Sequence, residues 1–146
     1  MSETETKYSK LLSEERLLEE QLSDFQSRIE IISAQIQDHI NASVTMNNLK
    51  NEQGHDALFP IGAQIYIRGT INDTSKVLIG LGAGISVEKT VEQASADLEA
   101  RVSNMQKLLA GLRDEYSKTA ERVNTLRSQL GETAQEIVQN RKKQTK

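Results

Sequence analysis

Three glycines, Gly80, Gly82 and Gly84, stand at alternate positions after an apolar run, where they could cradle a phosphate or turn the chain. A dinucleotide-binding loop needs G-x-G-x-x-G opening directly into a helix, but Ile85 stands where the third glycine should be. A P-loop needs Gly-Lys followed by Ser or Thr, and this stretch lacks it. Because apolar and polar residues alternate after Gly84, we expect a tight hairpin turn in which glycine supplies positive φ.

The sequence has few residues that could bind a metal or act as a general acid or base. Glu52 and His55 have the E-x-x-H spacing of di-iron bundles, but such a site needs a second copy and two more carboxylates. Gly54 also breaks the helix inside that pair, and His39 fits a partly buried seam position better than a ligand position. With no cysteine and two histidines, a thiol nucleophile and a Ser/His/Asp site are excluded. We therefore predict a protein that is not an enzyme and uses no cofactor or metal; a nucleotide hydrolase is the distant alternative.

Charge and hydropathy exclude further classes. The 146 residues carry a net charge of -3, which argues against nucleic acid as the main partner because phosphate neutralisation needs concentrated Lys and Arg. No apolar run approaches the ~20 residues that span a bilayer, so no membrane partner is expected. The first ten residues, MSETETKYSK, lack the apolar core of a secretion signal, so we expect a cytoplasmic location.

The helix-breaking residues are concentrated in the middle of the chain. Six of the eight glycines, and the single proline Pro60, lie between Gly54 and Gly84, and aromatics make up only 3% of residues. This composition is typical of long helices with a narrow apolar seam. We predict one mainly α domain over 1–146, with a helix at 7–52, a β-rich middle at 57–88 and a helix at 89–141.

Both outer segments repeat apolar residues with the alternating three- and four-residue spacing of a coiled-coil seam. In the first segment the seam blurs after Ile36, because His39 and Ser43 take the expected positions while Ile40 and Val44 lie beside them. A local shift in winding or a third contacting surface would explain this change. The seam residues are Leu11, Leu18, Leu22, Phe25, Ile29, Ile32 and Ile36, then Val91, Leu98, Val102, Met105, Leu109, Leu112, Tyr116, Thr119, Val123, Leu126, Leu130, Thr133 and Ile137.

The two seams are of similar length. At ~1.5 Å per residue each helix would be roughly 65–80 Å long, far more than a small globule needs. The simplest way to bury both seams is an antiparallel two-helix coiled coil within one chain. The alternative, that each seam pairs with another chain, remains open at this point.

The middle segment has the two-residue period of strands. Ile65, Ile67 and Ile71 share one face, as do Val77, Ile79 and Leu81. Turn residues separate the strands at Gly62-Ala63, at 72–75 and at 82–84. We therefore predict four short strands arranged as two central β-hairpins.

The stretch LFPIGAQIYIRGTINDTSKVLIGLGAGISVEKTVEQA, residues 58–94, resembles the central region of α-class prefoldin subunits of the archaeal type. The matching features are Pro60 and Gly62, the link at 72–74, the strand and turn at 77–84, and the residues 87–90 that enter the second helix. The order of helix, two hairpins and helix covers nearly the whole chain. β-class prefoldin chains have one hairpin, so the room for two favours the α class.

The resemblance implies a fold and a function. Prefoldins are ATP-independent chaperones in which two α-type and four β-type chains join through their hairpins into an inter-chain β-barrel platform, forming a heterohexamer. Coiled-coil arms extend from the platform, and their tips hold unfolded polypeptides and deliver them to a group II chaperonin in the cytosol. The resemblance thus implies a chaperone subunit that binds non-native proteins.

The hairpins are the expected subunit interface. Short strands with unpaired edges and an uncovered apolar face aggregate unless another chain pairs with them. Simple packing inside the chain is the competing reading for each residue. The interface candidates are Ile65, Ile67, Ile71, Val77, Ile79 and Leu81.

The paired chain ends are the expected client site. A two-stranded arm has no interior for a concave pocket, but splaying of its last turns would expose seam residues to clients, and several weak tips would add their affinities. Ordinary burial in the seam is the competing reading. The tip candidates are Tyr8, Leu11, Leu12, Leu130, Ile137 and Val138.

A structural coiled-coil adaptor that binds a native partner is the alternative function. It would assemble one folded partner stoichiometrically and ignore unfolded ones. The basic tail at 141–146 is expected to be a disordered end, although it could touch acidic clients or a chaperonin.

Overall fold

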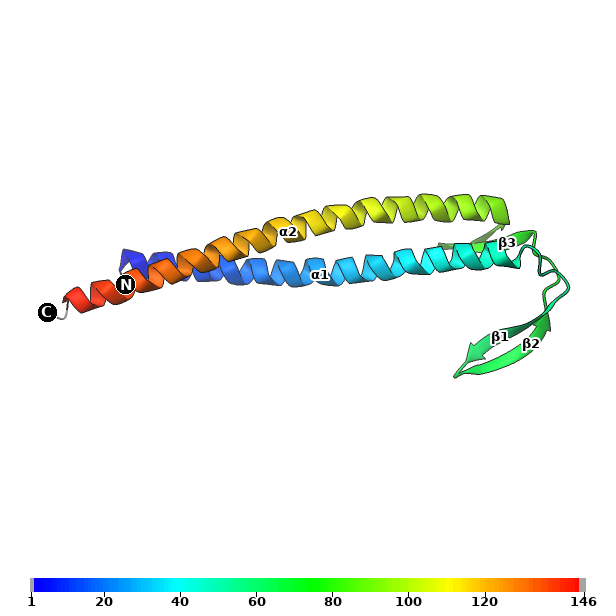
Figure 1. Cartoon of the computed structure of the whole chain (residues 1–146), viewed down its shortest axis with the longest axis horizontal. Helices are drawn as coiled ribbons and strands as arrows, with labels where there is room; N and C mark the ends of the chain where they lie inside the picture. The colour runs from blue at the N-terminus through cyan, green and yellow to red at the C-terminus, as the bar shows by residue number, and fades with distance from the viewer. Residues whose placement is uncertain (1, 145–146) are drawn as a thin grey trace. The chain divides into compact units, whose positions relative to one another are not determined.

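The computed structural model describes residues 2–144 as two long helices separated by four short strands. The prediction of a mainly α chain with two small antiparallel hairpins is confirmed (Figure 1). The elements follow in the order α1 (Glu3–Leu49), β1 (Asp56–Gly62), β2 (Ile65–Thr70), β3 (Lys76–Gly82), β4 (Ile85–Thr90) and α2 (Val91–Gln144).

The chain divides into two compact units. One joins the chain up to Ser33 with the chain from Lys107 onward, and the other is Ala34–Gln106. The first unit contains only parts of α1 and α2. The second contains the remainder of both helices together with the two hairpins.

Each helix begins at a reciprocal capping arrangement. The Ser2 backbone N–H donates to Glu5 Oε2 at 3.0 Å, and the Glu5 N–H donates to Ser2 Oγ at 3.2 Å. Thr90 and Gln93 exchange the same two bonds, each at 3.2 Å, at the start of α2. Such a capping box satisfies two N–H groups that have no partner within the helix. It explains why α1 starts at Glu3 rather than at residue 7, and α2 at Val91 rather than at residue 89.

The predicted seam is the core of both units. All of its members are buried or half-buried, and Leu126 and Val123 have exposed fractions of 0% and 3%. Burial of one such side chain contributes about 1.5–3 kcal/mol, so a seam of this length dominates the free energy of folding. The 3-4 spacing of buried positions continues after Ile36, because His39, Ser43 and Met46 are half-buried within an uninterrupted helix.

Ion pairs between the helices match the antiparallel register of the first unit. Glu14 Oε1 accepts from Arg122 at 2.7 Å and 3.1 Å, and Arg127 donates to Glu15 at 2.9 Å and also to Glu19. Exposed pairs of this kind contribute little to stability, typically about 0–1 kcal/mol. They connect early residues of α1 with late residues of α2, as expected for a chain that folds back on itself.

The glycine stretch forms a hairpin turn, as its spacing predicts. In each hairpin a two-residue loop joins the strands, with Gly62 paired to Ile65 and Gly82 paired to Ile85. Both loop residues have positive φ, 48° and 62° at Ala63 and Gln64, and 51° and 75° at Ala83 and Gly84. Two central residues with positive φ are typical of the type I′ turn, whose twist matches that of paired strands.

Short links anchor the hairpins to the helix ends in the second unit. Thr74 Oγ1 donates to the Lys50 carbonyl at 3.0 Å, and the Val91 N–H donates to the Ser75 carbonyl at 3.3 Å. Asp73 Oδ1 accepts from the Ser75 hydroxyl at 2.6 Å and from the Ser75 N–H at 2.7 Å, and these bonds lower the pKa of Asp73. The link between the two hairpins is therefore hydrogen-bonded both to the end of α1 and to the start of α2.

The two turns allow a matched test of backbone strain. Gln64 and Gly84 hold equivalent loop positions, but a side chain at positive φ costs about 1–2 kcal/mol that glycine avoids. Gln64→Gly is expected to raise the protection of the β1–β2 amides against hydrogen exchange by several-fold, whereas Gly84→Gln lowers that of β3–β4. Unchanged protection in both variants would contradict the turn assignment.

Candidate interaction surfaces

Each hairpin has apolar side chains along one of its faces. In the second hairpin Val77, Ile79 and Leu81 lie on this face, and Ile79 pairs across the ladder with Val87. Leu81 is 54% exposed, while Val77 and Ile79 are half-buried. This face is therefore only partly covered, and Leu81 is its exposed member.

The first hairpin repeats the arrangement. Phe59 pairs with Ile67, and a Cβ added at Gly69 would lie 2.7 Å from the Phe59 ring, so the ring lies directly over that glycine. Ile65 and Ile67 are both more than half exposed, and Ile71 is half-buried. All six interface candidates thus lie on the hairpins or directly after β2.

Sequence reasoning missed part of this surface. The exposed large apolar residues of the hairpins also include Leu58, Phe59, Ile61, Tyr66, Leu78 and Ile85, of which Leu78 is 76% exposed. Leu78 pairs with Glu88 and so lies on the face opposite Ile79. The unbroken apolar run from Val77 to Ile79 was the available signal, because strands covered on both faces read as continuous apolar runs.

Neither hairpin can hide this surface by itself. Each is a separate two-stranded sheet with an unpaired edge on both sides. A two-stranded hairpin is marginally stable alone and normally needs more strands or a covering element. The arrangement can therefore act chemically as a pairing surface for strands of other chains.

The tip candidates gather in the first unit, on the first turns of α1 and the last turns of α2. Tyr8, Leu11 and Leu12 on α1, like Leu130 and Ile137 on α2, are half-buried. Val138 is 52% exposed and lines a shallow depression of about 370 Å³ with Ala134 and Lys142. The described tail residues 141–144 belong to α2, so the expectation of a disordered end was wrong for them.

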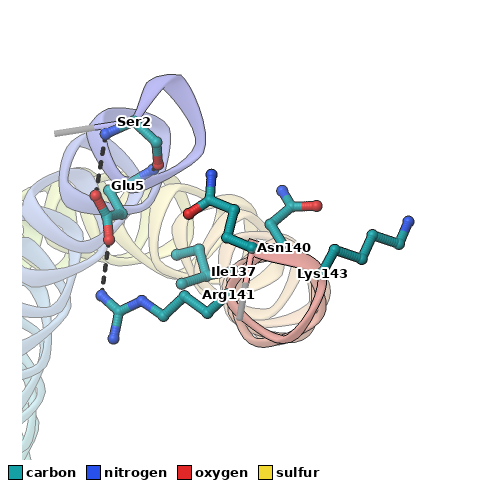
Figure 2. A pocket seen from close by; sticks show the side chains of 7 residues that line it. Ser2, Glu5, Ile137, Asn140, Arg141 and Lys143 are labelled. Carbon is teal, nitrogen blue, oxygen red and sulfur yellow. Dashed lines mark hydrogen bonds and ion pairs between the residues drawn. The ribbon is translucent and has the colours of Figure 1, made fainter. Parts of the chain in front are cut away.

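One carboxylate ties the two ends together. Glu5 accepts from the Ser2 backbone N–H and, through Oε1, from Arg141 Nη2 at 2.7 Å; Figure 2 shows both bonds. The Arg141 hydrogen bond, followed by that of Ser2, lowers the pKa of Glu5 from 4.5 to about 2. We call the pair of Glu5 and Arg141 the tip clasp.

The tip clasp closes one side of a mostly polar pocket of about 460 Å³. Ile137 is its apolar member, and Asn140 and Lys143 point outward beside it (Figure 2). Ile137 is also a seam residue, so the tip clasp lies beside the last apolar residue of the seam.

The E-x-x-H pair, Glu52 and His55, follows the end of α1. His55 Nδ1 and Glu52 Oε2 lie 2.6 Å apart on an exposed turn, so the two residues of the E-x-x-H spacing pair with each other. Within residues 2–144 no group of three or more His, Cys, Asp or Glu side chains could hold a metal ion. Neither helix, over the same residues, is long and apolar enough to cross a membrane.

The chain is similar in sequence to a known protein family and to several of its members. The prefoldin subunit family matches residues 18–136. "Prefoldin subunit alpha" of Methanococcoides burtonii is 29% identical over 133 residues, covering 90% of this chain and 96% of the relative. "Prefoldin subunit alpha" of Pyrococcus horikoshii is 24% identical and covers 99% of this chain and 95% of its own length.

A solved structure shares the architecture. A chain from the cryo-EM structure of filamentous PFD from Methanocaldococcus jannaschii is 20% identical, with a TM-score of 0.70 over 80% of this chain and 97% of that one. In this fold the β-barrel forms between chains, which accounts for the uncovered hairpins. The chain therefore belongs to the prefoldin family of non-enzymatic chaperones, and its relatives in that family are archaeal α subunits.

Proposed function

We propose that this chain is a subunit of an ATP-independent chaperone that captures non-native proteins at its paired helix ends and transfers them to a group II chaperonin in the cytoplasm. Membership of the prefoldin family supports a chaperone subunit that oligomerises with other prefoldin subunits. The observation that carries the capture step is the tip, where half-buried seam residues end beneath one exposed ion pair.

The assembly that we propose is a heterohexamer of two α-type and four β-type subunits. The hairpins supply its contacts, because apolar side chains such as Ile67 and Leu81 gain most by leaving water when a neighbouring strand covers them. The contact residues in this proposal are the six interface candidates, Ile65, Ile67, Ile71, Val77, Ile79 and Leu81. Main-chain pairing at the strand edges would add hydrogen bonds that the hairpins lack alone.

Client capture in this proposal uses opening of the tip. An exposed ion pair contributes little free energy, so the tip clasp can break at small cost. Opening would uncover Ile137 and then Leu130 and Leu11 beside the already exposed Val138. Each tip would bind weakly, and several tips on one assembly would add through effective concentration. No nucleotide is needed for this cycle.

Removal of the tips tests capture separately from assembly. Trimming the first ~10 and last ~15 residues, about two to four helical turns, removes Tyr8, Ile137 and Val138 together with the tip clasp, and leaves the hairpins intact. The trimmed chain, co-expressed with a β-type subunit, is expected to reach the mass of the full complex but no longer to suppress aggregation of denatured clients.

Two outcomes would count against the proposal. Full aggregation suppression by the trimmed complex would remove the tips from the mechanism. Stoichiometric binding of one native protein, with denatured clients ignored, would instead support a structural adaptor.

The tip clasp makes a pH-dependent prediction. Because Arg141 lowers the pKa of Glu5, the clasp is fully formed above about pH 4.5 and is lost as the pH falls toward 2. The Glu5 carboxyl carbon should therefore keep its ionised NMR shift at pH 3.5. In Arg141→Gln its midpoint should move upward toward 4.5, whereas Arg122→Gln, which removes the Glu14 pair, should leave it unchanged. A Glu5 midpoint near 4.5 in the unaltered chain would rule out the clasp.

A further inference from the structure

A groove of about 220 Å³ runs along one side of the helix pair in the second unit. Ile40 and Val44 of α1 form one wall, and Leu98 and Val102 of α2 form the other. All four side chains are aliphatic, whereas the tip pocket is mostly polar. The groove is therefore the most apolar hollow among those described above.

The groove arises where the seam becomes polar. Ser43 fills a seam position with a small side chain, so the two helices are left with space between them. The other polar seam residue, His39, is held to its own helix, because its Nδ1–H donates to the Gln35 carbonyl at 2.7 Å. Seam packing is thus incomplete at this place.

The missing apolar side chains lie one position away, on the outer side. Ile40 is 38% exposed and Val44 is 54% exposed, at the i and i+4 positions that share one helix face. Scattered exposed aliphatic residues are normal, but these two lie against Leu98 and Val102 in a common hollow. The pattern corresponds to the third contacting surface that the blurred sequence periodicity suggested.

The occupant follows from the position of the groove. Val44 is five residues before the end of α1, and Leu98 is seven residues after the start of α2, so the near edge of the groove lies about 8–10 Å from the two helix ends. The hairpins attach at these same ends and belong to the same compact unit. A chain that pairs with the hairpins already lies within reach of the groove.

The volume favours side chains over a small molecule. Small-molecule sites usually measure about 300–1,000 Å³ and bring together several polar groups, whereas this hollow is smaller and mainly aliphatic. Its rim is polar, with Glu99, Ser103 and Gln106. An apolar centre inside a polar rim is the usual anatomy of a protein–protein contact.

We propose that apolar side chains of a neighbouring prefoldin-type subunit dock in this groove. The inter-chain contact would then continue from the hairpins onto the adjoining ends of the helix pair. This inference rests on the assembly part of the proposed function and not on client capture. It assigns the exposed Ile40 and Val44 to a stabilising contact rather than to the seam.

The absence of cysteine from the sequence allows a clean chemical test. Val44→Cys places one thiol in the groove, and Leu17→Cys places one on the same helix at a similar exposure, 56%. The complex with the β-type subunit is purified, its mass is measured, and maleimide labelling rates are compared with those of the urea-unfolded chains, with no client present.

Docking predicts that the thiol of Val44→Cys in the complex reacts about tenfold more slowly than that of Leu17→Cys, because a covered thiol reacts only when the contact opens. Equal rates would overturn the groove proposal while leaving the assembly intact. A chain that stays monomeric would instead contradict the proposed assembly, and the groove contact with it.

A photo-crosslinker attached to the thiol of Val44→Cys identifies the occupant. A crosslink to another subunit supports the proposal, whereas crosslinks confined to the same chain, or formed only when client is added, would overturn it. Val44→Glu should also lower the yield of complex relative to Leu17→Glu, since both positions tolerate exposure but only one is expected to be covered.

Discussion

Packing of the two apolar seams against each other is the interaction on which the rest of the structure depends. The exposed ion pairs between the helices are individually weak, whereas the seam is buried or half-buried at each of its positions. Seam burial fixes α1 antiparallel to α2, brings Glu5 to Arg141, and places the hairpin joints at neighbouring helix ends. Without it neither helix would be stable, because isolated helices depend on tertiary contacts.

The proposed activities lie where the seam is incomplete. At the tip the seam ends beside the Glu5–Arg141 clasp. Breaking this ion pair costs little free energy, which suits the reversible client binding that we propose. At the groove Ser43 and His39 interrupt it, and the displaced Ile40 and Val44 face outward. Between these places it is tightly buried at Leu109, Leu112 and Leu126. The tightly buried part of the seam therefore stabilises the helix pair, whereas the tip and the groove are the parts that we propose to bind other proteins.

The helices and strands could be predicted from the sequence, but the contacts between them could not. Local period and turn chemistry specified the helices and hairpins, and Ser2-x-x-Glu5 and Thr90-x-x-Gln93 could have placed both helix starts. The tip clasp joins residues 136 apart, so it depends on the register between the helices, which periodicity alone does not define. The exposed face of Leu78 escaped notice because a single strand does not reveal which of its apolar faces another chain covers.

Pairing of the two seams within one chain can be tested by placing spin labels at two exposed positions of the first unit. The cysteine-free chain accepts a double Ser13→Cys, Ser128→Cys variant, diluted into an excess of unlabelled chain before assembly. Packed helices have axes about 8–10 Å apart, so a short inter-label distance that survives dilution is predicted. A distance that disappears on dilution, or that is long from the outset, would show that the seams pair between chains and would contradict the account.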